Sequence, residues 1–186
     1  MVKRAAKPII VAGMGNVMLR DDGVGLHALC ALRRVDPNGV QLADWGFPPR
    51  GQLVRLPRGA RILLLSAIRA GYPPGTVHQL READLDGKDW DELLPQAAIR
   101  DLLSHWPHKR DDLALLGVEP ADEDYGTNLS PEVRKALPSL LQAVEHIIAR
   151  WLNGRQSALS ARPAGRKRTN AHILPIPWPP LLHAGT

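Results

Sequence analysis

Acidic side chains that could bind a divalent cation or move a proton lie in the first quarter of the chain, at Asp21, Asp22 and Asp44. Asp21 and Asp22 separate a short apolar run, residues 8–14, from an apolar stripe of helical spacing that begins at Val24. Two interpretations of this pair remain open. In one, the carboxylates cap the start of a helix, where the helix dipole favours negative charge. In the other, one caps and the second faces a cleft as a metal ligand or an acid, since carboxylates suit hard or borderline divalent ions.

The histidines are a weaker signal than these carboxylates. His105 and His108 have a spacing that suits chelation, although two solvated histidines of a surface loop produce the same pattern. His27 lies near the Asp22 end of a predicted helix. Like Asp44, it is a candidate for the cleft, although packing or capping is the more common role of such residues.

Sequence motifs for several common chemistries are incomplete or missing. The Gly13-Met14-Gly15 turn is similar to the start of a dinucleotide fingerprint, but Met18 occupies the position of its third glycine. The chain has no Gly-Lys-Ser/Thr phosphate loop and no Gly-x-Ser-x-Gly nucleophile motif. Cys30 is the only cysteine, which excludes an internal disulfide and a thiolate metal cage. We expect it to be a small core residue of a helix.

Strands and helices must alternate along the chain to position these residues. Apolar, partly β-branched runs predict five strands, at residues 8–14, 39–45, 61–67, 76–80 and 112–118, the fourth of them at a sheet edge. Three- and four-residue spacing predicts three helices, at residues 24–35, 97–103 and 131–152, the last capped by Ser130 and stopped by Asn153-Gly154.

This order predicts an α/β fold: a three-layer αβα arrangement in which a mostly parallel, twisted sheet carries helices on both faces. Ligands of such sheets gather beyond the carboxyl ends of the strands. The loops that contain Asp22, Asp44 and Ser66 are therefore the expected place for a site.

Composition divides the 186 residues into two parts. Residues 1–153 are expected to form one domain, and residues 154–186 a basic, proline-rich, flexible tail. The net charge of +5 resides in this tail, so the neutral domain gives no reason to expect nucleic acid as a partner. No apolar run approaches the roughly 20 residues that span a bilayer, and no secretory signal is recognisable. We therefore expect a cytoplasmic protein with no membrane partner.

Six motifs in the expected order resemble the nickel–iron hydrogenase maturation endopeptidase family. The similarity spans about residues 8–152, outside the tail. The matching segments are residues 9–16 with 21–25, 44–46, 66–68, 74–77, 116–120 and 129–133.

The resemblance implies an endopeptidase that removes the C-terminal extension of a hydrogenase large-subunit precursor after nickel insertion. The nickel is then carried by this precursor, the expected partner, and is not tightly bound by the chain alone. A one-to-one encounter with the precursor requires no dimer, so we expect a monomer. The family contributes three metal-facing residues: an acid after the first strand, an aspartate after the third, and a histidine before a later helix.

Only the first of these three positions carries a ligand in this sequence. Asp22 matches the acidic residue, whereas Ser66 stands at the aspartate position and Pro95 at the histidine position. Serine is a poor neutral ligand and proline offers none, so the affinity for a divalent metal should be weakened.

The resemblance leaves two hypotheses for function. The first is the family's endopeptidase activity, with Asp22 as the metal-facing carboxylate, Asp44 as a second catalytic carboxylate, and His105 and His108 as substitute ligands. The second is a catalytically impaired relative that serves hydrogenase assembly as a non-proteolytic chaperone or checkpoint.

Overall fold

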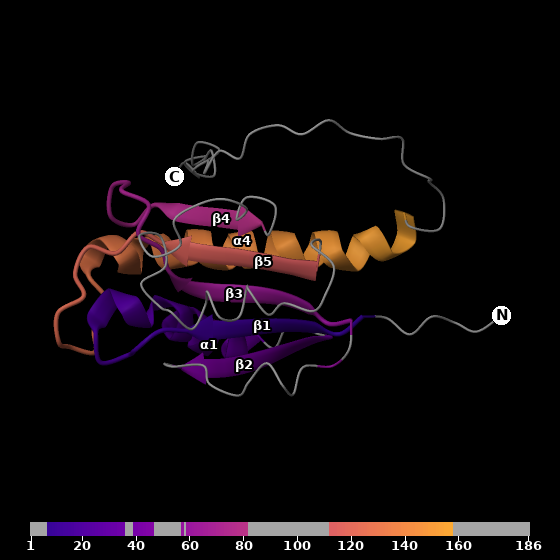
Figure 1. Ribbon diagram of the computed structural model, residues 1–186, viewed down its shortest axis with the longest axis horizontal. Helices are drawn as coiled ribbons and strands as arrows, with labels where there is room; N and C mark the ends of the chain where they lie inside the picture. Colours follow the sequence, from indigo (N-terminus) through magenta and orange to yellow (C-terminus); the bar gives the residue numbers. More distant parts are fainter. Residues whose placement is uncertain (1–6, 36–38, 47–56, 58, 82–111, 158–186) are drawn as a thin grey trace, which may run out of the picture.

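Five strands and two helices carry the fold of the part of the chain that the structure describes. This computed structural model describes residues 7–35, 39–46, 57, 59–81 and 112–157 (Figure 1). The strands are β1 (Ile9–Met14), β2 (Val40–Gly46), β3 (Arg61–Ala67), β4 (Val77–Arg81) and β5 (Leu113–Val118). A 3-10 turn, η1 (Arg20–Gly23), precedes helix α1 (Val24–Val35), and helix α4 (Pro131–Ser157) follows β5.

The strands form a single sheet in the order β2-β1-β3-β5-β4. All neighbouring pairs are parallel except β4 and β5, which are antiparallel. The predicted strands are thus confirmed to within a residue or two at each end, and the strand predicted for an edge lies there. The continuous apolar runs are explained by their place, because parallel strands in the centre of a sheet are buried on both faces.

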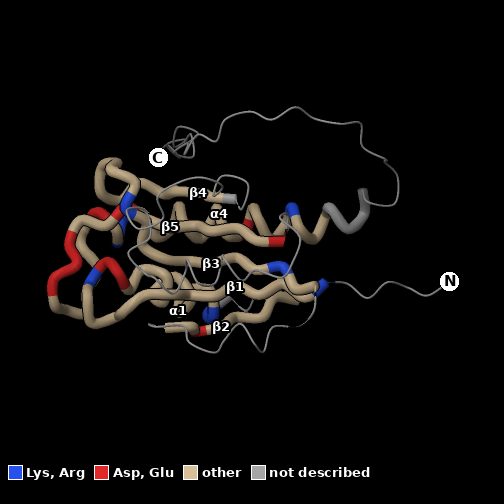
Figure 2. Tube along the Cα trace, viewed as in Figure 1, with Lys and Arg blue, Asp and Glu red and all other residues tan. Residues whose placement is uncertain are grey.

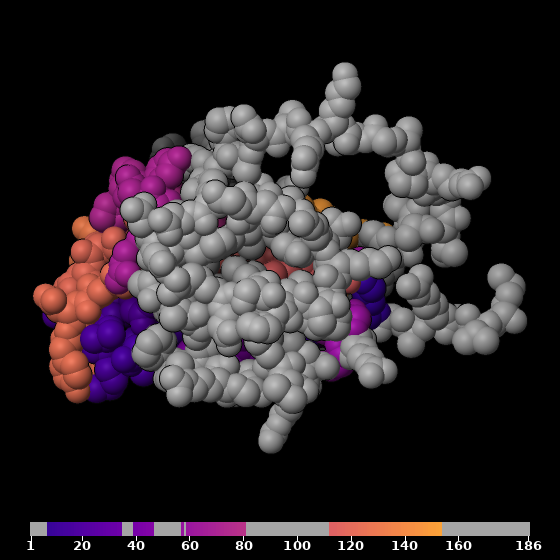
Figure 3. All heavy atoms as spheres, viewed as in Figure 1, coloured from indigo at the N-terminus to yellow at the C-terminus, as the bar shows by residue number. Residues whose placement is uncertain are grey.

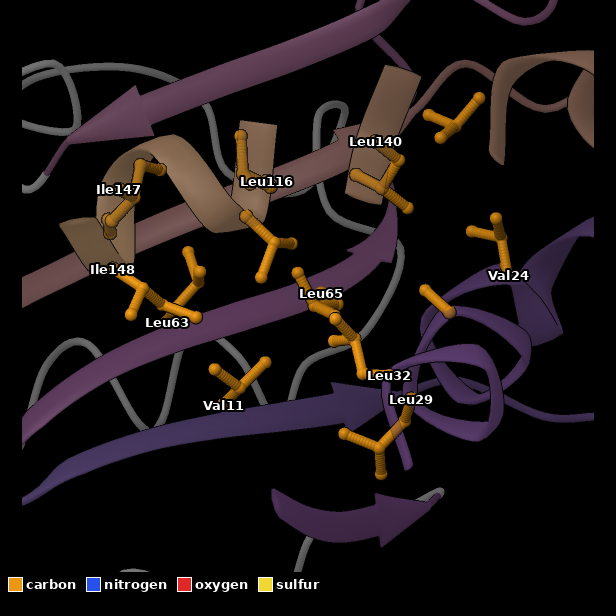
Figure 4. Packing of buried hydrophobic residues seen from close by; sticks show 14 of the residues in the cluster. Val11, Val24, Leu29, Leu32, Leu63, Leu65, Leu116, Leu140, Ile147 and Ile148 are labelled. Atoms are coloured by element: carbon orange, nitrogen blue, oxygen red, sulfur yellow. The ribbon is translucent and has the colours of Figure 1, made fainter. Parts of the chain in front are cut away.

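Both faces of the sheet are buried. Helices α1 and α4 lie on the same face, where Leu63 and Leu65 of β3 join a cluster with Leu29 of α1 and Leu140 of α4 (Figure 4). On the opposite face, side chains such as Leu64 belong to a second buried cluster. The α/β class and the mostly parallel sheet are confirmed. The helix predicted for residues 97–103 lies outside the described residues.

The two ends of α4 test the predicted helix signals separately. At the start, the Ser130 hydroxyl accepts a hydrogen bond from the Val133 N–H at 3.3 Å, as predicted for the cap. The stop predicted at Asn153-Gly154 is wrong, because α4 continues to Ser157. A glycine inside a helix costs only about 1 kcal/mol relative to alanine, so it does not by itself end one.

Cys30 does not lie in the core, contrary to the expectation. Its side chain is exposed, because the buried stripe of α1 passes through Ala28, Leu29 and Leu32 and leaves position 30 on the outer side. None of the helices in the described ranges has the length and hydropathy needed to cross a membrane.

Candidate functional site

The candidate site lies where the loops after β1, β3 and β5 meet, at the carboxyl ends of these strands (Figure 1). The chain leaves β1 through α1 to reach β2 on one side, whereas β3 lies on the other side of β1. Such a reversal of direction is where open α/β sheets bind their ligands. The expected place for a site therefore coincides with the topological switch point of this sheet.

Two glycines bring η1 and α1 close to the strand ends. A Cβ atom on Gly25 would lie 2.1 Å from the Leu65 carbonyl oxygen and 2.5 Å from that of Met14, so α1 packs directly on β1 and β3. Gly15 has a φ of +125°, and a Cβ atom there would lie 1.8 Å from the Asp22 carbonyl oxygen. Only glycine permits this approach, and it fixes η1, with Asp21 and Asp22, at the ends of the strands.

Asp21 holds the loop after β5. Its side chain is fully buried. Its Oδ2 atom accepts hydrogen bonds from the N–H groups of Ala121 and Asp122, each at 2.9 Å, and Oδ1 accepts one from Ser130 at 2.7 Å. These donors lie about 100 residues away in sequence, so the capping interpretation is wrong for Asp21. Its carboxylate joins two loops instead.

Asp22 lies beside Asp21 and contacts the loop after β1. Its Oδ2 atom accepts a hydrogen bond from the Asn16 N–H at 2.7 Å, and the residue is 7% exposed. The carboxylate that the resemblance singles out is thus fixed at the switch point in a nearly buried position. A ligand must approach it closely to make contact.

Asp44 and Ser66 lie at the same end of the sheet in different environments. Asp44 is exposed at the end of β2. Ser66 is fully buried near the end of β3, and its hydroxyl has no hydrogen-bond partner among the described residues. β1 lies between their strands, which separates the two backbones by about 10 Å. Direct contact between the two side chains is therefore not expected.

A buried histidine–carboxylate pair lies on the β4 side of the site and was not predicted from the sequence. His78 Nε2 lies 2.8 Å from Glu119 Oε2, and both side chains are buried. Burial lowers the pKa of His78, while the hydrogen bond and the negative charge of Glu119 oppose this shift. Because Glu119 is the acceptor, Nε2 carries the proton of a neutral imidazole. His78 Nδ1 is buried without a partner in the described part of the chain.

Glu119 also holds the loop after β3. Its carboxylate accepts hydrogen bonds from the N–H groups of Ala70 and Gly71, at 2.9 and 3.1 Å. The sequence contained one signal for this role, because Glu119 directly follows a predicted strand, as Asp44 does. His78 gave none, since it occupies an alternating position of a short edge strand where a polar residue is commonly exposed.

Acidic residues are concentrated at this end of the molecule (Figure 2). Six acids of the described loops face two arginines, and both arginines already form ion pairs: Arg20 with Asp122 at 2.9 Å, and Arg69 with Glu123, whose Nε–Oε2 distance is 2.6 Å. The acids are Asp21, Asp22, Glu119, Asp122, Glu123 and Asp124. The edge therefore favours a positively charged ligand.

The described side chains do not form a metal centre. No three His, Cys, Asp or Glu residues among them are grouped so as to hold a metal ion. His105, His108 and Pro95 lie outside the described residues, so their predicted roles stay predictions. His27 is on α1, half-buried, and its Nε2 atom is buried without a hydrogen-bond partner in the described ranges.

An open α/β fold, with a mostly parallel sheet and an acidic edge at its switch point, is the class that these observations define. The model of the HycI hydrogenase maturation protease family matches residues 26–147, more than half of the chain. The chain belongs to the hydrogenase maturation protease family.

Curated relatives agree with this assignment. The hydrogenase expression/formation protein HupD of Thiocapsa roseopersicina is 28% identical over 159 residues, which cover 77% of this chain and 69% of that protein. HupD of Rhizobium leguminosarum bv. viciae is 26% identical over 174 residues, which cover 86% and 81%.

Solved structures show the same fold. The hydrogenase maturating endopeptidase HybD from Escherichia coli superposes with a TM-score of 0.62 at 25% identity, covering 78% of this chain and 93% of that one. For the maturation protease HybD from Thermococcus kodakarensis, the TM-score is 0.61 at 21% identity, with 75% and 97% covered. The three-layer α/β arrangement that the sequence predicted is thus the fold of these proteins.

Proposed function

We propose that the chain is an endopeptidase that removes the C-terminal extension of a nickel-loaded hydrogenase large-subunit precursor. The observation that carries this proposal is the place of Asp22: the side chain at the family's first acidic position is fixed at the switch point by the Asn16 N–H, at 2.7 Å. Membership of a maturation protease family supports the reaction class.

In this proposal the nickel belongs to the substrate. Asp22 binds the nickel at an open coordination position or contacts a group bound there. This contact aligns the precursor at the carboxyl edge of the sheet. The metal polarises the carbonyl group or orients the water that attacks it, while the protein positions the scissile bond. Asp44, exposed at the neighbouring strand end, is the second candidate carboxylate. Because Asp44 lies on β2, we place its carboxylate against the substrate peptide and not against the nickel.

The second candidate function is a non-proteolytic checkpoint that binds the precursor without cutting it. One observation favours it: Ser66, at the family's aspartate position, is fully buried and provides no anion. Binding of the precursor requires fewer functional groups in the site than hydrolysis does. A site that lacks one of the expected carboxylates can therefore still bind.

The test combines the full-length chain with a purified nickel-loaded precursor, and mass spectrometry follows the large subunit. We expect the wild-type chain to shorten the subunit. Asp22→Asn is the informative variant, because its side-chain oxygen can still accept the Asn16 hydrogen bond while the negative charge is lost. The expected decrease in rate is about 100-fold, a barrier increase of ~2.7 kcal/mol, as for the removal of one preorganised electrostatic contact.

Glu145→Gln is the matched control, since it removes an exposed carboxylate from α4, away from the carboxyl edge of the sheet. The control should leave the rate within twofold of the wild-type rate. Binding of the precursor without shortening by the wild-type chain would establish the checkpoint function instead. Equal rates for wild type and Asp22→Asn would rule out the role proposed for Asp22.

A further inference from the structure

Three large apolar side chains are exposed in the described part of the chain, and all three lie at the carboxyl edge. Val17 is 41% exposed, Met18 39% and Tyr125 75%. Val17 and Met18 belong to the loop after β1, and Tyr125 to the loop after β5. We call these three residues the loop-tip patch.

The backbone brings the two loops together. The Gly126 N–H donates to the Met18 carbonyl oxygen at 2.9 Å, and the Arg20 N–H donates to the Gly126 carbonyl oxygen at 2.9 Å. Leu19 and Gly126 form an isolated parallel bridge between these bonds. Figure 3 shows the indigo and orange loops as one continuous surface at this end of the molecule. The loop-tip patch is therefore a fixed part of the surface.

Exposure of these side chains has no structural explanation within the fold. The other large apolar residues of the described ranges are buried or partly buried, including those at the same strand ends, such as Met14 and Ile68. An exposed apolar group on a rigid loop loses the free energy that burial would provide, about 25 cal/mol per Å². Grouped exposed apolar side chains mark an interaction site.

The surroundings of the loop-tip patch define the partner's chemistry. Asn16, whose N–H contacts Asp22, directly precedes Val17, so the patch continues from the proposed catalytic carboxylate. On the Tyr125 side the preceding residues are Asp122 and Glu123, which are paired with Arg20 and Arg69, and the exposed Asp124; with Asp22 and Glu119, the acids of this edge outnumber its two arginines. Apolar side chains next to concentrated negative charge complement a peptide that carries both apolar and basic side chains.

We propose that the loop-tip patch binds the precursor's C-terminal extension, through a segment that carries an apolar side chain next to lysine or arginine. This inference rests on the proposed function, since it assigns a binding surface to the substrate of that same site. The patch provides affinity for the peptide, whereas Asp22 acts at the metal-bearing end.

The experiment measures binding and turnover for a Val17→Ser, Met18→Ser, Tyr125→Ser triple variant of the full chain. The probes are the nickel-loaded precursor and the same large subunit without its extension. We expect the dissociation constant for the precursor to increase about 30-fold, equivalent to ~2 kcal/mol, as for loss of an aromatic anchor and its neighbours. The kcat should stay within twofold of the wild-type value. Gln142→Ser, at an exposed position of α4, is the control and should change neither quantity.

Salt provides an independent measurement of the acidic surroundings. Binding of the precursor to the wild-type chain should weaken between 50 and 500 mM salt, roughly the range over which the Debye length falls well below 10 Å. Binding of the large subunit without its extension should be insensitive to the triple substitution.

Three results would overturn the inference: a dissociation constant for the precursor within threefold of wild type, an equal loss of affinity for the subunit without its extension, or a dimer of the chain that the triple variant dissociates.

The proposed function fails separately. If the wild-type chain binds but does not shorten the precursor, and the triple variant weakens that binding, the patch is confirmed and the proteolytic step is refuted. If cleavage proceeds with an unchanged KM in the triple variant, the opposite holds.

Discussion

Replacing Asp21 with alanine tests whether this carboxylate holds the two loops of the site together. The substitution removes the acceptor of three N–H groups, on Ala121, Asp122 and Ser130. A hydrogen bond to a charged group contributes about 1.5–3 kcal/mol when its donor is left buried, and less when water can replace the acceptor. Ser130 is buried, whereas Ala121 and Asp122 are nearer the surface. We therefore expect about 2 kcal/mol from the first and about 1 kcal/mol from each of the others.

The predicted decrease in the free energy of unfolding is thus about 4 kcal/mol, a large part of the 5–15 kcal/mol of a typical domain. Urea unfolding followed by circular dichroism measures it, with Asp124→Ala as a surface control that should remain within about 0.5 kcal/mol of wild type. Because the loop that carries Tyr125 is released, affinity for the precursor should decrease as well.

A loss below about 1 kcal/mol for Asp21→Ala would refute this reasoning. It would mean that water replaces the carboxylate at all three donors, including the buried N–H of Ser130. Normal stability with weakened binding would show that the carboxylate orders the loop only in the complex.

Two further predictions concern stability. Burial lowers the pKa of His78 below its value in the unfolded chain, so the folded state binds fewer protons. The contribution of His78 to the free energy of unfolding is therefore fully present above about pH 6.5 and is lost as the pH falls below that value. In His78→Gln, urea unfolding at several pH values should show less of this acid-side decrease than in wild type, and identical profiles would contradict the assignment. Gly25→Ala should lower the unfolding free energy by more than about 3 kcal/mol, because its Cβ atom would meet backbone oxygens that cannot move aside; a thermal melt within about 2 °C of wild type would show that α1 shifts freely.

The fold was predictable from the sequence to the extent that burial alone determines it. The run at residues 61–67 became β3 (Arg61–Ala67) because a strand buried on both faces must be apolar at every position. The exposure of Cys30 was missed because helical spacing gives the period of a stripe but not its width. The continuation of α4 through Gly154 was missed because a local stop signal competes with the hydrogen bonds of a long helix.

The site was predictable only in its location. The rule for strand ends placed Asp22, Asp44 and Ser66 at one edge of the sheet, and the structure agrees. It could not distinguish Asp21 from Asp22, because the donors that hold Asp21 lie about 100 residues away. The His78–Glu119 pair depends on the antiparallel pairing of β4 with β5, in which His78 stands opposite Gly117. Such a pairing leaves no mark in the local sequence.

The three hydrogen bonds of Asp21 also constrain the order in which the loops at the carboxyl edge come together during folding. During synthesis, η1 is made early, but its carboxylate has no donors to hold until residues 121–130 have emerged and β5 has joined the sheet. Until then the loop after β1 and the loop after β5 are separate parts of the surface. In a truncated or half-folded copy the loops after β1 and β5 are therefore not joined, and this end of the molecule forms only when β5, the last described strand in the sequence, is in place.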